Sequence, residues 1–169
     1  GSGAILENVT ISNNIAETAG SGIYCMHGGR ATLLNSIITD QICLEFDRRY
    51  DPNSVRVNYS NISGGIVNQE NENQFNHNSI DIGDGVISSN PLFVSPENGD
   101  YHLSHDSPCI DTGDPESPLN PDGTRADMGA FYFHQSLLDH VLEVPIEYQT
   151  IQRAIDASID GDTVLVHSG

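Results

Sequence analysis

The feature that most constrains the fold of this chain is a loose internal repeat between residues 4 and 66. The segments LENVTIS, LNSIIT and VNYSNIS resemble one another in the order of their apolar and polar residues. When Ile11, Ile38 and Ile62 are treated as equivalent, the repeats lie about 27 and 24 residues apart. Periods of this length are typical of solenoid proteins, in which short units stack on one another.

Within each repeat, apolar and polar residues alternate as they do in a β-strand. This alternation places Val9 and Ile11 on one face of the strand and Thr10 on the other. A single strand cannot bury its apolar face, but stacked repeats bury it against their neighbours. A leucine-rich repeat would need a denser leucine pattern. We therefore predict an all-β protein whose first part is a parallel β-helix, with Gly- and Asn-rich corners and a second strand at residues 23–26.

Three segments depart from this pattern. The charged residues 44–56 are predicted to leave the coil as a loop, and the polar residues 64–79 to form a wide loop. Residues 90–133 are dense in Pro, Gly, Asn and Asp, which favours short extended pieces joined by tight turns. We interpret this closing segment as a lid over the end of the repeat array.

The last 26 residues have a different character. Apolar residues at Ile151, Ala154, Ile155 and Ile159 are spaced as on one face of a helix, and Thr150 stands where a helix N-cap would be. Gly161 would end this helix, and residues 163–166 would form a short buried strand.

Charge and cysteine content exclude some functions. The chain has 24 acidic residues against six basic ones, all arginine, so its net charge is −18. Such a charge repels nucleic acids and anionic membrane surfaces, and it would repel a uronic-acid polymer unless Ca²⁺ bridged the two. Cys25, Cys43 and Cys109 are expected to be buried thiols, although a Cys25–Cys43 disulfide is possible. No signal peptide or transmembrane run is present, so we expect no membrane insertion.

The strongest candidate for a site is an acidic run within the closing segment. Oxygen ligands on a Gly- and Pro-rich loop are the kind that Ca²⁺ requires. The alternative is that these side chains accept hydrogen bonds from turn N–H groups and pair with Arg125. The candidate metal ligands are Asp111, Asp114, Asn120, Asp122 and Asp127.

Two stretches resemble known proteins. SNPLFVSPENGDYHLSHDSPCIDTGDP and PDGTRADMGAFYF resemble the C-terminal closing segment of bacterial secreted proteins with right-handed parallel β-helix repeats, of the pectin-lyase-like superfamily. The preceding GIYC, LLNSII and VNYSNISGG resemble the coils before it. VPIEYQTIQRAIDASIDGDTVLV resembles the start of another β-helix, where a short amphipathic helix caps the N-terminal end.

The resemblance implies a right-handed β-helix in a protein that is secreted or displayed on a bacterial cell surface. It divides the chain into coils (1–89), a closing segment (90–133), a linker (134–143) and the N-terminal cap of a following unit (144–169). This order indicates a fragment of a tandem array, with neighbouring β-helix domains as partners. The alternative is a rearranged domain whose last helix and strand cover the end near Gly3.

Three kinds of function are compatible with the sequence. Polysaccharide lyases of this fold typically use Ca²⁺ with an Arg or Lys base, and glycoside hydrolases use paired carboxylates. No dense carboxylate cluster falls on the predicted strands, so a non-catalytic module is favoured. It would either contact polysaccharides or other surface glycans or serve as an architectural spacer, and the sequence does not separate these two roles.

Overall fold

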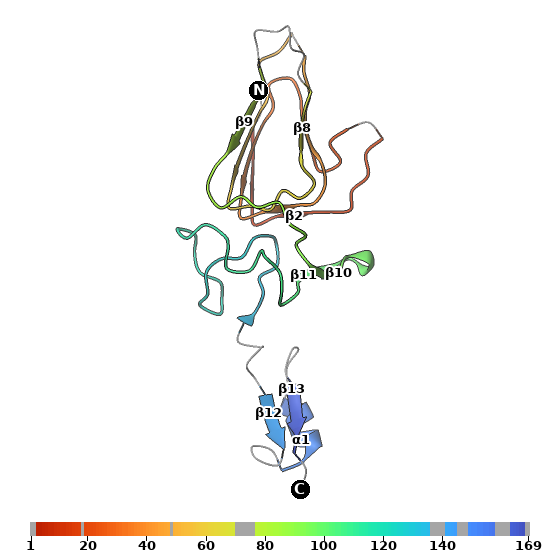
Figure 1. The fold of residues 1–169 in the computed structure, drawn as a ribbon, viewed down its shortest axis with the longest axis vertical. Coiled ribbons are helices and arrows are strands. Elements are labelled where there is room, and N and C mark those ends of the chain that lie inside the picture. The colour runs from red at the N-terminus through yellow and green to blue at the C-terminus, as the bar shows by residue number, and fades with distance from the viewer. Residues whose placement is uncertain are drawn as a thin grey trace. The chain divides into compact units, whose positions relative to one another are not determined.

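The computed structural model describes residues 3–17, 19–47, 49–69, 77–135, 141–144, 149–157 and 163–167. These residues form mostly β-strands with one short α-helix, so the all-β prediction is confirmed (Figure 1). The chain divides into two units. The first comprises residues 1–120 and 125–133, and the second comprises residues 121–124 and 134–169.

Residues 3–89, which we call the repeat body, form three parallel sheets. The chain runs through the three sheets in turn, and its segments lie one behind another along three sides in Figure 1. The first sheet has the order β1 (Gly3–Glu7), β4 (Arg30–Leu34), β7 (Ser54–Asn58) and β9 (Ser79–Ile82). The second pairs β2 (Thr10–Ile11) with β5 (Ile37–Ile38), and bridges at Asn61 and Ile87 continue it. The third has the order β3 (Ile23–Cys25), β6 (Ile42–Leu44) and β8 (Ile66–Asn68).

The strand register follows the period seen in the sequence. Gly3 aligns with Arg30, Arg30 with Ser54, and Ser54 with Ser79, so the repeats are 27, 24 and 25 residues long. The predicted spacings of 27 and 24 are confirmed. The predicted second strand at residues 23–26 is confirmed as β3.

Both predicted loops are too long. Leu44 ends β6 and Ser54 begins β7, so only residues 45–53 separate these strands. Residues 66–68 form β8 and residue 79 begins β9, while residues 70–76 lie outside the described part. Backbone hydrogen bonds to β6 and β7 hold these strands although most of their side chains are exposed. The sequence analysis did not predict β8 and β9 as strands because most of their side chains are polar or exposed.

The core of the repeat body consists of side chains that point inward from the three sheets. Ile11, Ile38 and Ile62, which the alignment of repeats made equivalent, all belong to it, and Ile38 is completely buried. Burying each such side chain stabilises the fold by about 1.5–3 kcal/mol. The fully buried members from the other strands are Leu33, Ile42, Leu44, Val55 and Val57.

Two polar features mark the corner that follows β1, β4 and β7 in the first sheet. Asn8, Asn35 and Tyr59 follow β1, β4 and β7 in the left-handed backbone region, with φ of 53°, 47° and 42°. Asn tolerates this conformation better than most residues do. Beside this corner, buried hydroxyls link successive repeats, because Val9 N donates to Ser36 Oγ (3.2 Å) and Ser36 N donates to Ser60 Oγ (3.1 Å).

The closing segment (residues 90–133) covers a side of the repeat body, so the prediction of a lid over its end is wrong. Ala130 N donates to Thr10 Oγ1 in the first repeat (3.0 Å), and Asn61 Nδ2 in the third repeat contacts Cys109 Sγ (3.2 Å). The outward face of the second sheet carries Ile37, which packs with Leu103, Cys109 and Met128. The register places Thr10, Ile37, Asn61 and Ile87 in one row, so the segment covers a row of polar and apolar side chains along the sheet. The segment itself contains β10 (Phe93–Ser95), a 3₁₀ turn η1 (Pro96–Asn98) and β11 (Asp100–Leu103), with β10 and β11 antiparallel.

The second unit is a strand–helix–strand element. β12 (Val141–Val144) pairs in parallel with β13 (Thr163–Val166), and α1 (Ile151–Ala157) lies between them in sequence. The predicted cap is confirmed, because Arg153 N donates to Thr150 Oγ1 (3.3 Å). Ala154 and Val144 are buried and pack with Val164.

Three expectations for this region change. Residues 141–143 belong to β12, so they are not part of a linker; their backbone pairs with β13. The predicted buried strand is only partly buried, since Leu165 and Val166 are 42% and 51% exposed. The proposed helix end at Gly161 and the helical position of Ile159 lie outside the described residues.

Candidate functional site

Asp127, the most buried of the predicted metal ligands, is engaged by the backbone. Its two carboxylate oxygens accept hydrogen bonds from Asp111 N (2.7 Å) and Phe133 N (2.6 Å). Burial raises the pKa of Asp127, and the two backbone hydrogen bonds oppose this rise. The carboxylate thus fixes the turn at Asp111 to the end of the closing segment.

Asp114 and Asn120 also serve the turns around them. Asp114 N donates to Asn35 Oδ1 (2.6 Å), and the Asp114 carboxylate accepts from Glu116 N (2.9 Å). Asn120 Nδ2 donates to the carbonyl of Arg125 (2.9 Å). The Arg125 guanidinium donates to the carbonyl of Gly113 (Nε to O 2.7 Å). A turn N–H therefore binds the Asp114 carboxylate, as the alternative expected. Asn120 and Arg125 instead donate to main-chain carbonyls.

Asp122 belongs to the second unit, whereas the other four candidates belong to the first. Its carboxylate accepts hydrogen bonds from the N–H and hydroxyl of Thr124 (3.1 and 2.7 Å) and from Gln135 N (2.9 Å). Partial burial acts to raise the pKa of Asp122, but these hydrogen bonds outweigh it and lower the pKa.

These contacts are a poor fit to a Ca²⁺ site, which needs six to eight converging oxygen ligands. Several of the oxygens already accept backbone hydrogen bonds. Among the described residues, no group of three or more His, Cys, Asp or Glu side chains is arranged to hold a metal ion. The Ca²⁺ site remains a prediction.

A second candidate site lies on the outward face of the first sheet. Because side chains alternate along a strand, each of β4, β7 and β9 directs two polar residues outward while Ala31, Val55 and Ile80 between them point inward. The outward residues line a groove of about 300 Å³. They are Arg30, Thr32, Ser54, Arg56, Ser79 and Asp81.

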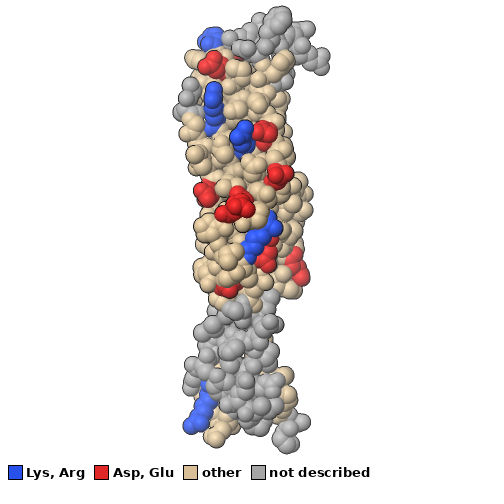
Figure 2. Space-filling model, turned by 90° about the vertical axis from the view of Figure 1, so that its left-hand side faces the viewer, with Lys and Arg blue, Asp and Glu red and all other residues tan. Residues whose placement is uncertain are grey.

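The groove contains both charge signs. Arg56 Nε donates to Asp81 Oδ2 at 2.7 Å across neighbouring strands, and both side chains are more than half exposed. Figure 2 views the side on which β9 lies in Figure 1, and there charged side chains are interspersed among uncharged ones. An exposed pair of this kind contributes little to stability, so both groups remain available to a ligand.

Sequence reasoning missed this groove because it placed Arg56 in a loop and did not predict β9. A signal was present in Ser54–Asn58 (SVRVN), where Val55 and Val57 alternate with polar residues as they do in the neighbouring strands. The alternation alone could have identified Arg56 as an outward strand residue.

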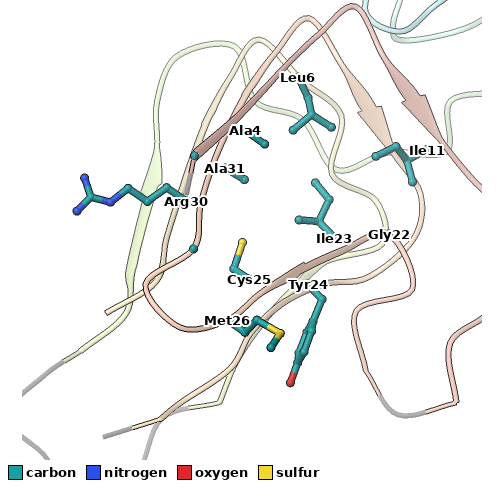
Figure 3. Close-up of a pocket in the computed structure, with 12 residues that line it drawn as sticks. Ala4, Leu6, Ile11, Gly22, Ile23, Tyr24, Cys25, Met26, Arg30 and Ala31 are labelled. Atoms are coloured by element: carbon teal, nitrogen blue, oxygen red, sulfur yellow. The ribbon is translucent and has the colours of Figure 1, made fainter. Parts of the chain in front are cut away.

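An apolar hollow of about 460 Å³ opens at the end of the repeat body formed by β1, β2 and β3. Figure 3 shows Leu6, Ile11 and Ile23 pointing into the hollow and Arg30 pointing away from it. These side chains face the same interior as the buried core, but no further repeat covers them in the described part of the chain.

The loop between β6 and β7 holds a small charged cluster. Arg49 contacts Asp47 through both Nε (3.0 Å) and Nη2 (2.7 Å), and the His27 ring lies 4.0 Å from the Tyr50 ring. Hydrogen bonds from the side chain and backbone of Arg49 lower the pKa of Asp47 to about 2.

The three cysteines are free and buried, as expected. The register aligns Cys43 with Tyr24 and Cys25 with Leu44, so the two thiols point to opposite faces of their sheet. This arrangement rules out the Cys25–Cys43 disulfide. Burial raises the pKa of all three thiols, which favours the unreactive protonated form.

Comparisons with protein-family models, with curated proteins and with solved structures found no match for this chain. No helix among the described residues is long and apolar enough to cross a membrane.

Proposed function

We propose that the repeat body is a right-handed parallel β-helix and that the closing segment seals one of its sides. The support is the order in which the chain visits three parallel sheets, with a register that advances by 24 to 27 residues. Right-handed crossovers between parallel strands are strongly favoured for L-amino acids. The resemblance of residues 90–133 to the ending of pectin-lyase-like β-helices points the same way.

We further propose that the chain is a non-catalytic module, secreted or displayed on a bacterial cell surface, that contacts glycans through the groove on the first sheet. The observation that carries this proposal is the set of outward hydroxyl, guanidinium and carboxylate groups on three adjacent strands. Sugars offer hydroxyls that both donate and accept, so such a mixed lining suits them. Neighbouring β-helix domains of one polypeptide would extend the same face.

The arginines influence which glycan is favoured. Arg30 and Arg56 are two of only six cations in a chain of charge −18, and both line the groove. A planar guanidinium binds a carboxylate in a bidentate manner. Local attraction at the groove therefore offsets part of the general repulsion of uronic-acid units, and added Ca²⁺ would offset more.

A polysaccharide lyase or glycoside hydrolase fragment is the alternative. Arg56 favours a lyase, because it projects from a rigid strand into a groove and could act as a base. Hydrolysis has less support, since it needs two carboxyl groups flanking the bond and Asp81 is the single carboxylate among the described residues that line the groove. Asp81 is also paired with Arg56 at 2.7 Å.

Binding of oligosaccharides, measured by calorimetry with separate neutral and uronic-acid panels, tests the glycan proposal. Arg56→Ala should weaken binding of the preferred ligand by about tenfold, the effect of losing a charge-assisted hydrogen bond. Arg153→Ala changes an exposed arginine of α1 and should leave binding unchanged. Equal binding by both variants, or no binding by the unmodified chain, would reject the groove as the glycan site.

An activity assay separates the module from the enzyme. The chain is incubated with uronic-acid polymers in the presence and absence of Ca²⁺, and unsaturated or reducing ends are measured. We expect none above the buffer control. Product formation that Arg56→Ala abolishes would establish the lyase alternative.

A further inference from the structure

The two arginines of the groove have different surroundings. Arg56 lies beside Asp81 in the strand register, and its Nε donates to Asp81 Oδ2 (2.7 Å). Arg30 is exposed, and its neighbours in its own row of the first sheet are Gly3 and Ser54, which carry no charge. Among the residues that the structure describes, Arg30 forms no ion pair. One guanidinium is therefore compensated by a carboxylate, and the other is not.

The charges change from strand to strand across the groove. β4 contributes the guanidinium of Arg30, whereas the pair of Arg56 and Asp81 spans β7 and β9. Neighbouring strands of a sheet lie about 4.8 Å apart, which is close to the length of one sugar unit in a glycan. A glycan that crosses the strands would therefore meet an uncompensated cation at one unit and a neutral ion pair at the next.

A glycan with a carboxylate on every unit fits this order poorly. A carboxylate over β9 would face Asp81, in a chain whose net charge is −18, and like charges repel at such a contact. A single carboxylate over β4 would instead meet Arg30. The other outward residues of the groove, Thr32, Ser54 and Ser79, offer hydroxyls that suit uncharged units.

We propose that the groove selects a glycan in which acidic and neutral units alternate. Arg30 holds the carboxylate of the acidic unit, because a planar guanidinium can bind a carboxylate through two hydrogen bonds. The following neutral unit lies on the ion pair of Arg56 and Asp81. Arg56 contacts Asp81 through Nε, so its terminal N–H groups can donate to sugar hydroxyls while the carboxylate accepts from others. This inference rests on the glycan-binding function proposed above and names the class of glycan.

Calorimetry with three oligosaccharides of equal length tests the proposal. A hyaluronan oligosaccharide has a carboxylate on alternate units, an oligogalacturonate has one on every unit, and a cello-oligosaccharide has none. All measurements are made in chelator, so that Ca²⁺ cannot bridge two carboxylates. The unmodified chain should bind the hyaluronan oligosaccharide about tenfold more tightly than either of the others, the effect of one charge-assisted contact.

Two variants separate the roles of the charged groups. Arg30→Gln should still bind the hyaluronan oligosaccharide and the cello-oligosaccharide but lose the preference between them. Asp81→Asn removes the opposing carboxylate, so the oligogalacturonate should approach hyaluronan in affinity. Arg153→Gln and Asp106→Asn change exposed groups outside the groove and are the matched controls, with all three affinities unchanged. Circular dichroism confirms that each variant keeps the β-type spectrum of the unmodified chain.

The possible failures are distinguishable. Binding of none of the three oligosaccharides would reject the groove as a glycan site, and this inference with it. Equal binding of the hyaluronan and neutral oligosaccharides, or tightest binding of the oligogalacturonate, would overturn this inference and leave glycan binding in place. An Arg30→Gln variant that keeps the preference for hyaluronan would do the same. An equal loss of preference in Arg153→Gln would assign the effect to the net charge of the chain and would also overturn the inference.

Discussion

The repeat body and the closing segment are stabilised in different ways, although all of the closing segment except residues 121–124 belongs to the same unit as the body. The body depends on parallel backbone ladders around an apolar interior. The closing segment has one short antiparallel pair, and polar side chains such as Asp127 and Ser107 hold much of its remaining backbone. A ladder tolerates many sequences that keep its period. A segment held by individual side chains depends on the identity of each one.

The largest expected effect is in the body. Ile38→Asp places an unpaired charge among fully buried apolar side chains and should lower the free energy of unfolding by about 4 kcal/mol or prevent folding. Urea unfolding followed by circular dichroism measures it. Thr32→Asp faces outward from the same repeat and should cost about 0.5 kcal/mol or less. Similar losses in both variants would mean that the inward and outward faces are misassigned.

In the closing segment, Asp127→Asn should cost about 1–3 kcal/mol. The two carboxylate oxygens each accept one backbone N–H, and an amide would turn its own NH₂ toward one of these donors. The urea midpoint reports the loss. Asp106→Asn, at an exposed carboxylate of the same segment, is the control and should change the midpoint little. An unaffected Asp127→Asn variant would show that the segment does not depend on this side chain.

A bound cation would give the closing segment a further source of stability. The calcium prediction expects a stabilisation of about 1.4 kcal/mol at ten times the dissociation constant, with a weaker effect of Mg²⁺. Melting curves in Ca²⁺ and in chelator should then separate, and Asp122→Ala should abolish the separation. Coincident curves would leave the turn N–H groups as the partners of these carboxylates.

The smallest effect concerns a loop of the body that is held by side chains, like the closing segment. The Asp47 carboxyl should titrate with a pKa of about 2, and Arg49→Ala should return it toward 3.8. Since the folded pKa lies below the unfolded one, the stabilisation is present above pH 3.8 and is lost as the pH falls through 2. Carboxyl NMR titration measures it, with Arg56→Ala as control. An unshifted pKa would show that Arg49 does not hold Asp47 in solution.

The sequence could predict the body because its period recurs. The alignment of Ile11, Ile38 and Ile62 identified core positions and repeat lengths, since an inward position must be apolar in every repeat. It failed at β8 and β9, because strands at an open end keep their backbone pairing but not their apolar character. Residues 79–82 show this, with all four side chains exposed.

The closing segment and the groove were harder to predict for a related reason. Their form depends on which distant residues meet: Asp114 with Asn35, Ala130 with Thr10, and Arg56 with Asp81. Local turn chemistry identified residues 90–133 as irregular and sealing, but it carries no information about the surface that they cover. Ile37 offered the one hint, because an apolar residue beside the inward Ile38 needs a cover on its own face.

The attachment of the closing segment along the second sheet has a consequence for how proteins of this kind can change in length. The segment contacts Thr10 in the first repeat, Asn35 in the second, Asn61 in the third and Ile87 in the fourth. The length of the closing segment is therefore matched to the number of repeats that it spans. Inserting or deleting one repeat of about 25 residues would preserve every strand register, yet it would shift the attachment points beyond the change by one strand spacing, about 4.8 Å. Lengthening by duplication should thus require a matching insertion within residues 90–133, so that the two regions gain or lose length together.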